Sequence, residues 1–129
     1  MKFLNMEQHK NFWKIKDQIP AEYKGDKELL SLAYIMASSE ELNKKMGPYI
    51  NWVNGFDYEK MFANESFSAS EKTLAKVAVV LYDNGVNLEF VEVFSELDPQ
   101  GKEVALMAAN YRYDKKDIYD PTNESFHIN

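Results

Sequence analysis

The sequence contains no cysteine and only two histidines, and it has no long hydrophobic run. Without cysteine it can form no disulfide, no thiolate metal site and no cysteine nucleophile, which fits a reducing compartment. Its longest apolar run, residues 77–82, is far shorter than the roughly 18 residues that cross a bilayer. The first residues, MKFLNMEQHKNFWK, lack the apolar core and cleavage site of a secretory signal. We therefore expect a cytoplasmic protein without a membrane span.

Motifs typical of catalysis and metal binding are also missing. His9 lies in a polar stretch near the start and His127 near the end, and neither belongs to a metal-binding pattern such as H-E-x-x-H. There is no phosphate-binding glycine loop and no calcium-binding loop. Ser70 and Lys72 are two residues apart on a predicted helix, so they point in different directions and do not form a serine–lysine pair. We predict no catalytic residue, no metal site and no cofactor; an enzyme assembled from distant residues is only the third alternative.

What the chain does contain is typical of a globular protein. Its 129 residues are 45% hydrophobic and 28% charged, which is enough for one domain with its own core. No repeat, low-complexity tract or linker divides it, so we predict a single domain over residues 1–129. Residues 114–129 are polar and interrupted by Pro121, yet they contain four large apolar side chains: Ile118, Tyr119, Phe126 and Ile128. This tail either is flexible or docks on the body or on a partner.

Helix-capping residues recur along the chain. The candidate N-terminal caps are Asn5, Asp26, Ser38, Asp57, Ser68, Asn87 and Asp98. Ser38 and Ser68 each stand three residues before a glutamate, which is the capping-box spacing. The helices should cover residues 6–18, 29–36, 39–46, 58–62, 69–83, 88–96 and 99–113. We predict a compact all-α fold of six or seven helices.

The most regular passage is FSASEKTLAKVAVVLYDNG, residues 67–85. Ser68 and Glu71 form a capping box at its start, and Asn84-Gly85 is typical of a left-handed stop at its end. Between them, apolar residues recur at helical spacing: Leu74, Val77, Ala78 and Leu81. The passage therefore predicts a core helix rather than a catalytic site.

Negative charge is concentrated in the second half of the chain. The formal net charge is −6, and residues 65–129 carry twelve acidic and six basic side chains, whereas residues 1–64 carry nine of each. Such a surface repels phosphate backbones and disfavours nucleic acid. Glu89, Glu92 and Glu96 fall on one face of a predicted helix whose apolar face contains Phe90, Val93, Phe94 and Leu97. This acidic stripe is either a solvated face or a contact for a basic partner.

Aromatic residues gather around one predicted turn, Asn54-Gly55. Six rings occur within residues 49–67: Tyr49, Trp52, Phe56, Tyr58, Phe62 and Phe67. Aromatic side chains with a polar end are frequent at interfaces and in ligand clefts. The rings either pin an irregular connection to the core or form a binding surface.

One stretch, LAYIMASSEELNKKM, has the layout of a helix-turn-helix motif. Asn43 falls where the second helix should bury an apolar residue, and that helix would present Glu40 and Glu41 to DNA. Only Lys44 and Lys45 favour DNA binding. A DNA-binding regulator is therefore the alternative function rather than the first.

Five segments carry a family resemblance: NMEQHKNFW, LAYIMASSEEL, GPYINW, FSASEKTLAKVAVVLYDNG and VFSELD. Their order resembles small helical proteins of Gram-positive bacteria and their phages or mobile elements, which are grouped as domains of unknown function. The similarity covers most of residues 3–113. It implies an all-α cytoplasmic protein and assigns no activity, cofactor or catalytic residue.

Together these features predict a small acidic protein that acts by binding another protein, as a regulatory or immunity-type inhibitor. The predicted partner-binding residues belong to the aromatic segment and the acidic stripe: Tyr49, Trp52, Phe56, Tyr58, Glu89, Glu92 and Glu96. A basic partner would suit the acidic second half. Both a monomer and a homodimer are compatible with the apolar content.

Overall fold

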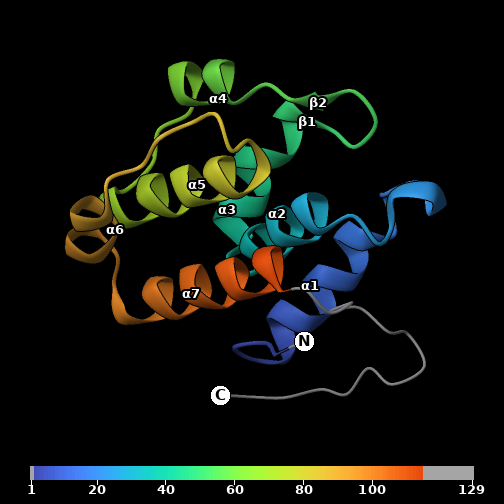
Figure 1. The fold of residues 1–129 in the computed structure, drawn as a ribbon, viewed down its shortest axis with the longest axis horizontal. Helices are drawn as coiled ribbons and strands as arrows, with labels where there is room; N and C mark the ends of the chain where they lie inside the picture. The colour runs from blue at the N-terminus through green and yellow to red at the C-terminus, as the bar shows by residue number, and fades with distance from the viewer. Residues whose placement is uncertain (1, 115–129) are drawn as a thin grey trace.

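The computed structural model describes residues 2–114, and seven α-helices make up most of this part of the chain (Figure 1). The helices are α1 (Met6–Lys16), α2 (Lys27–Ala37), α3 (Glu40–Met46), α4 (Tyr58–Asn64), α5 (Ala69–Tyr82), α6 (Phe90–Glu96) and α7 (Pro99–Tyr113). Two 3₁₀ turns, Ala21–Tyr23 and Gly47–Tyr49, and a two-stranded hairpin of β1 (Ile50–Asn51) and β2 (Gly55–Phe56) connect them. The prediction of an all-α fold is confirmed.

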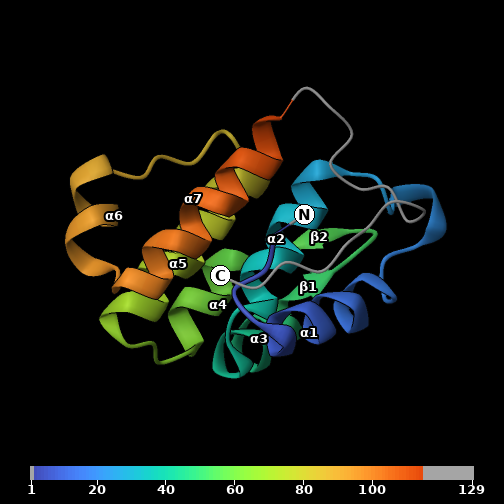
Figure 2. The ribbon, with the colours of Figure 1, turned by 90° about the horizontal axis from the view of Figure 1, so that it is seen from below.

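The central element is α2, which packs against α1, α3, α5 and α7. Eight consecutive residues of this helix are buried: Leu30, Ser31, Leu32, Ala33, Tyr34, Ile35, Met36 and Ala37. A helix that is apolar around most of its circumference has to be covered on several sides. Figures 1 and 2 show α5 and α7 side by side next to α2, with α6 at one end of this pair.

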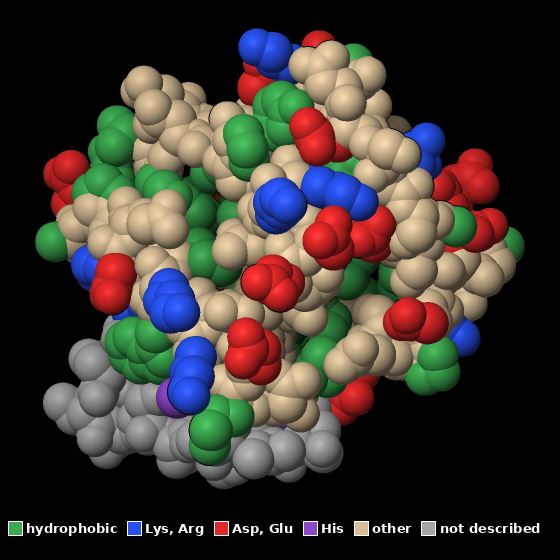
Figure 3. Space-filling view, turned by 180° about the vertical axis from the view of Figure 1, so that it is seen from behind, with side chains coloured by type: hydrophobic (Ala, Val, Ile, Leu, Met, Phe, Trp, Pro, Cys, Tyr) green, Lys and Arg blue, Asp and Glu red, His purple; other side chains and the backbone are tan. Residues whose placement is uncertain are grey.

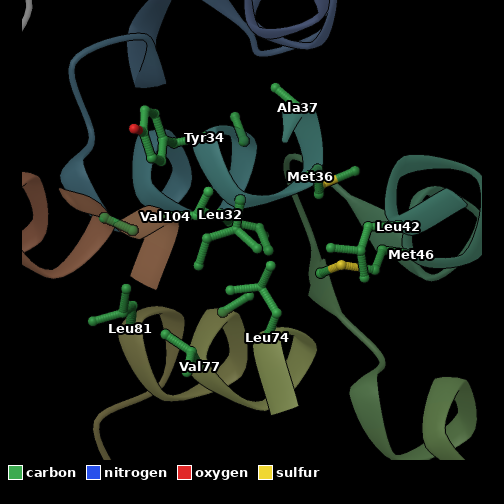
Figure 4. Close-up of a cluster of buried hydrophobic side chains, with 14 of the residues drawn as sticks. Leu32, Tyr34, Met36, Ala37, Leu42, Met46, Leu74, Val77, Leu81 and Val104 are labelled. Carbon is green, nitrogen blue, oxygen red and sulfur yellow. The ribbon is translucent and has the colours of Figure 1, made fainter. Parts of the chain in front are cut away.

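Aliphatic side chains fill the space between α2, α5 and α7 (Figure 4). Leu32 comes from α2, Leu74 and Val77 from α5, and Val104 from α7, and all four are buried. The same cluster extends through Met36 to the buried side chains of α3. Area burial of this kind, at about 25 cal/mol per Å² of apolar surface, is the main force that holds such a domain together.

Most of the predicted caps are present. Asn5, Asp26, Asp57, Ser68 and Asp98 each accept a backbone hydrogen bond at the start of a helix. In α5 the capping box is reciprocal: the Glu71 backbone N donates to Ser68 Oγ at 3.1 Å, and the Ser68 backbone N donates to Glu71 Oε1 at 2.9 Å. These local bonds fix where the long helices begin.

The predicted cap Ser38 is wrong by one residue. Ser39 caps α3 and accepts a hydrogen bond from the Leu42 backbone N at 3.2 Å. Ser38 instead ends α2, and its hydroxyl donates to the Ile35 carbonyl oxygen at 2.6 Å. The two helices are therefore separated by only two serines, each bonded to a different helix.

The expected left-handed stop at Asn84-Gly85 is also wrong. Within residues 2–114 the only glycine with a positive φ is Gly55. After α5 the chain continues in an extended conformation at Asp83, whose Oδ1 accepts a hydrogen bond from the Gly85 backbone N at 2.9 Å. The aspartate side chain provides the turn, so a left-handed glycine is not required.

Residues 115–129, which include His127 and all of the predicted tail except Asp114, lie outside the described part of the chain. In residues 2–114, none of the helices combines the length and the hydrophobicity needed to cross a bilayer.

Candidate functional site

The β1–β2 hairpin shapes the centre of the aromatic segment. Ile50 pairs with Phe56, and Asn51 pairs with Gly55. The Asn51 Oδ1 atom accepts hydrogen bonds from the backbone N atoms of Val53 and Asn54, both at 2.9 Å. Gly55 completes the turn with a φ of 130°, a conformation that side-chain-bearing residues avoid. The predicted turn is thus a tight and well-bonded structure.

Most rings of this segment are tied to the body of the protein. Phe56 is only 7% exposed, and its ring packs edge-on against Tyr58 and Tyr82 at centroid distances of 5.8 and 5.9 Å. The Tyr58 hydroxyl donates to Asp83 Oδ2 at 3.0 Å. The Tyr49 hydroxyl donates to Oε2 of Glu65, which directly follows α4, at 2.6 Å. These bonds favour the interpretation that the rings pin the connection to the core.

The hydrogen bonds to carboxylates also set the ionisation of the two tyrosines. The bond to Glu65 raises the pKa of Tyr49, and the bond to Asp83 raises the pKa of Tyr58. An ionised phenol could not donate to a carboxylate and would be repelled by it. Both hydroxyls therefore stay protonated at neutral pH and act as donors that hold the segment in place.

Trp52 is the ring of this segment that reaches toward the start of the chain. It is half-buried, and its Nε1 donates to Oε1 of Gln18 at 3.4 Å. Its neighbour Val53 is 61% exposed at the tip of the hairpin. The predicted residues of the aromatic segment thus differ in exposure, with Phe56 in the core and Trp52 at the surface.

The acidic stripe is divided between two environments. Glu92 pairs with Lys76 of α5, with Oε1 and Nζ 2.5 Å apart. Glu89, at the N-terminal cap position of α6, and Glu96, at its last residue, are exposed. Neither of these two forms an ion pair with another residue among 2–114. Glu92 therefore holds α6 against α5, whereas the carboxylates of Glu89 and Glu96 are exposed to solvent.

The prediction that Phe90 belongs to a buried face of this helix is wrong. Phe90 is 76% exposed and Val91 is 73% exposed. The helix begins at Phe90 rather than near residue 88, and only Val93 and the following Leu97 turn toward the core. Phe90 stacks on Phe94, with a centroid distance of 4.6 Å, instead of packing on another helix.

Phe90 and Phe94 border an apolar groove between α5, α6 and α7, which we call the α6 groove. It has a volume of about 270 Å³, and all of its lining residues are hydrophobic. Its lining residues include Val80, Leu88, Ala105 and Leu106 of α7, which is 52% exposed. Soluble proteins seldom expose large contiguous apolar patches unless these bind something.

A second hollow, of about 450 Å³, adjoins the α6 groove, and Val80 and Leu88 line both. Its walls include Tyr58 and Phe62 of α4 on one side and Glu92 of α6 on the other. The fold therefore brings part of the aromatic segment and part of the acidic stripe to this second hollow. We call this second hollow the α4–α5 cavity.

Sequence reasoning missed the α6 groove, although a signal was present. Leu106 does not share a helix face with the buried residues Val104, Ala108 and Tyr111 of α7, and Val91 lies outside the predicted apolar face of α6. Large apolar residues that no helix face accounts for are candidates for a surface patch.

The helix-turn-helix alternative rests on α2 and α3. Lys45 is engaged with acidic side chains, at 3.2 Å from Glu71 and 3.9 Å from Glu41, while Lys44 is exposed. Glu40 and Glu41 are exposed on the first turn of α3. Figure 3, which views the side opposite to that of Figure 1, shows acidic and basic side chains intermixed. No observation here favours contact with a phosphate backbone.

The remaining histidine, His9, has a structural role. Its Nε2 accepts a hydrogen bond from Trp13 Nε1 at 2.9 Å, and its ring meets the edge of Phe3. In the described part of the chain, no three histidine or acidic side chains lie close enough together to hold a metal ion.

Comparison with protein-family models, with curated protein sequences and with solved structures finds no match for this chain. The resemblance to helical domains of unknown function stays a prediction.

Proposed function

We propose that this protein is a protein-binding module whose α6 groove receives the apolar face of a basic amphipathic helix. The observation that supports this most directly is the exposure of Phe90 and Leu106, which both line a groove whose lining residues are all hydrophobic. An amphipathic helix that lays its apolar side chains into a groove is a common recognition mode.

The charge distribution supports a basic partner. Residues 83–114 carry seven acidic and two basic side chains. Glu89 and Glu96 stand exposed at the two ends of α6, while Arg112 is engaged with Glu28. Acidic groups at the rim of an apolar contact attract lysine and arginine and accelerate association. A second copy of this chain would bring the same acidic rims together, so the charges oppose a homodimer through this face.

The closeness of the two hollows would give the site the length that a helix needs. The α6 groove and the α4–α5 cavity share Val80 and Leu88, so apolar side chains spaced one or two helical turns apart could occupy both. An acidic module of this kind suits a regulatory or immunity-type inhibitor that covers a basic protein in the cytoplasm. No catalytic step and no nucleic acid is needed for this function.

Backbone amide NMR with designed peptides tests the proposal. We would titrate the labelled protein with a leucine–lysine amphipathic helix of about 18 residues, with a leucine–glutamate helix and with a scrambled leucine–lysine peptide. The proposal expects the cationic helix to perturb the amides of α6 and α7 and to bind at least about tenfold more tightly than the other two.

Two substitutions localise the binding. Phe90→Asp and Leu106→Asp should each weaken the cationic helix about tenfold or more, whereas Val53→Asp, at a comparably exposed residue of the hairpin, should leave it unchanged. Equal affinity for the acidic helix, or binding insensitive to both groove substitutions, would contradict the proposal. A dimeric mass in sedimentation that Phe90→Asp abolishes would assign the face to self-association instead.

A further inference from the structure

A pocket of about 400 Å³ lies between the hairpin, the N-terminal end of α2 and the C-terminal end of α5. Figure 1 shows these three segments on the same side of the molecule, away from α6. None of its lining residues belongs to the α6 groove or to the α4–α5 cavity. Whatever binds here is therefore independent of the function proposed above.

The walls of this pocket combine aromatic rings with carboxylates. The rings belong to Tyr23, Trp52 and Tyr82, and the carboxylates to Asp26, Glu28 and Asp83. No lysine, arginine or histidine is among the lining residues. Aromatic faces attract cations through their quadrupole, and carboxylates supply the opposite charge. This combination is suited to an organic ammonium ion and unsuited to an anion.

We propose that this pocket binds an alkylammonium group, which Trp52, Tyr23 and Tyr82 would contact through their rings and Asp26, Glu28 and Asp83 would neutralise. A bare metal ion is a poorer occupant, because no three acidic side chains in the described part of the chain lie close enough together to hold one. The ammonium group could belong to a free amine or to a lysine side chain of another protein.

The carboxylates retain capacity for such a ligand. Arg112 reaches Glu28 from outside the pocket, with its NH2 atom 3.2 Å from Oε1. Asp83 already accepts bonds from the Tyr58 hydroxyl and the Gly85 backbone N, and Asp26 accepts from the Glu28 backbone N. Each carboxylate has about four lone-pair sites, so these bonds leave room for further donors.

The electrostatic field in the pocket is negative. Hydrogen bonding to Asp26 and, next, burial raise the pKa of Glu28, in spite of the opposing effect of Arg112. Two carboxyl groups that share a site resist simultaneous ionisation. A cation between them would relieve this repulsion, so binding of an ammonium ion should lower the pKa of Glu28.

One of the three rings, Tyr82, is held in place by its neighbours. A Cβ atom at Gly55 would lie 3.2 Å from the Tyr82 hydroxyl oxygen, so the hairpin backbone sits directly against this ring. Tyr82 packs in turn on the buried Phe56. Binding sites whose walls are rigid before the ligand arrives lose less conformational entropy on binding.

Choline and its neutral carbon analogue, 3,3-dimethylbutan-1-ol, provide the first test, read by backbone and indole NMR signals. The proposal expects choline to shift the Trp52 indole and the amides of residues 51–55, with an affinity at least about tenfold above that of the alcohol. Equal shifts from both compounds, or none at about 50 mM choline, would overturn the proposal.

Variants and a titration separate binding from folding. Trp52→Leu and Glu28→Gln should each weaken choline about fivefold or more, while Trp52→Phe should retain most of the affinity and Tyr49→Phe, outside the pocket, all of it. Thermal unfolding of each variant verifies the fold. Carboxyl-carbon NMR should show the pKa of Glu28 falling when choline is bound, and an unchanged pKa would count against the assignment.

The source of the ammonium group follows from a second comparison. Spermidine represents a free amine. The methylamide of Nα-acetyl-lysine, whose side-chain ammonium group is free, represents a lysine side chain in a protein. Tighter binding of spermidine supports a metabolite site, and tighter binding of the lysine derivative supports a peptide contact. If neither compound displaces choline, the proposal that the pocket binds a free amine or a lysine side chain is overturned.

Discussion

The Nζ atom of Lys76 lies 2.5 Å from Oε1 of Glu92, and this ion pair joins α5 to α6. The pair matters because α6 has seven residues, none of which is fully buried. A helix of that length does not persist in water without tertiary contacts. The position of Phe90 and Phe94, and with it the shape of the α6 groove, therefore depends on this contact and on Val93 and Leu97.

We expect Lys76→Met to loosen α6 while changing the global free energy of unfolding by no more than about 1 kcal/mol, because the pair is partly solvent-exposed. Amide hydrogen exchange across residues 90–96 should become faster. Lys72→Met, at an exposed lysine of the same helix, is the matched control. Unchanged exchange in α6 after Lys76→Met would mean that apolar contacts alone hold this helix.

Gly55 gives a second prediction, because its φ of 130° and its closeness to Tyr82 both exclude a side chain. Gly55→Ala should lower the free energy of unfolding by about 1–3 kcal/mol through backbone strain. Gly25→Ala, where a Cβ would meet no atom within 4 Å, should be neutral or slightly stabilising. Urea unfolding of both variants makes the comparison, and equal losses would contradict the assigned strain.

The two Asn-Gly pairs explain which turns the sequence could predict. Asn54-Gly55 lies where the turn enters β2, and Gly55 pairs with Asn51 of β1, so the hairpin imposes the positive φ on this glycine. At Asn84-Gly85 the side chain of Asp83 provides the turn bond, and the glycine keeps a negative or extended φ. The dipeptide is the same in both places, and only the neighbouring structure distinguishes them.

Most helix starts were predictable for a related reason, although the caps expected at Ser38 and Asn87 are wrong. Caps such as Ser68 and Asp98 are bonded to residues three positions away, so the signal and its partner lie in one short stretch. The orientation of α6 is different, since it depends on the surface that α5 and α7 leave free. The walls of the pocket proposed for an ammonium group are harder still to predict, because Tyr23, Trp52 and Tyr82 come from separate parts of the chain.

A third prediction concerns Ser31, whose hydroxyl is buried in α2 and has no hydrogen-bond partner among the described residues. Ser31→Ala removes a desolvated polar group and keeps the helix, so we expect a gain in stability of up to about 1 kcal/mol. Ser38→Ala is the contrasting variant. The Ser38 hydroxyl donates to the Ile35 carbonyl oxygen at 2.6 Å, so its removal should lower the free energy of unfolding. A loss of stability in Ser31→Ala would show that the hydroxyl has an unrecognised partner.

The last prediction is the pH dependence that Glu71 contributes. Its hydrogen bond from the Ser68 backbone N is the main cause that lowers its pKa below the ordinary 4.5, with a contribution from Lys45. The folded state thus binds fewer protons than the unfolded one in this range, so the stabilisation is complete above about pH 4.5 and disappears as the pH falls through the lowered pKa. Glu71→Gln should therefore cost no more than about 1 kcal/mol near neutral pH, because solvent screens the charge, and nothing in strong acid.

Urea unfolding between about pH 7 and pH 2 measures the difference from the parent protein, with Glu40→Gln, an exposed first-turn glutamate of α3, as the control. A difference that persists unchanged into strong acid would mean that the glutamate acts through packing and hydrogen bonding, not through its charge.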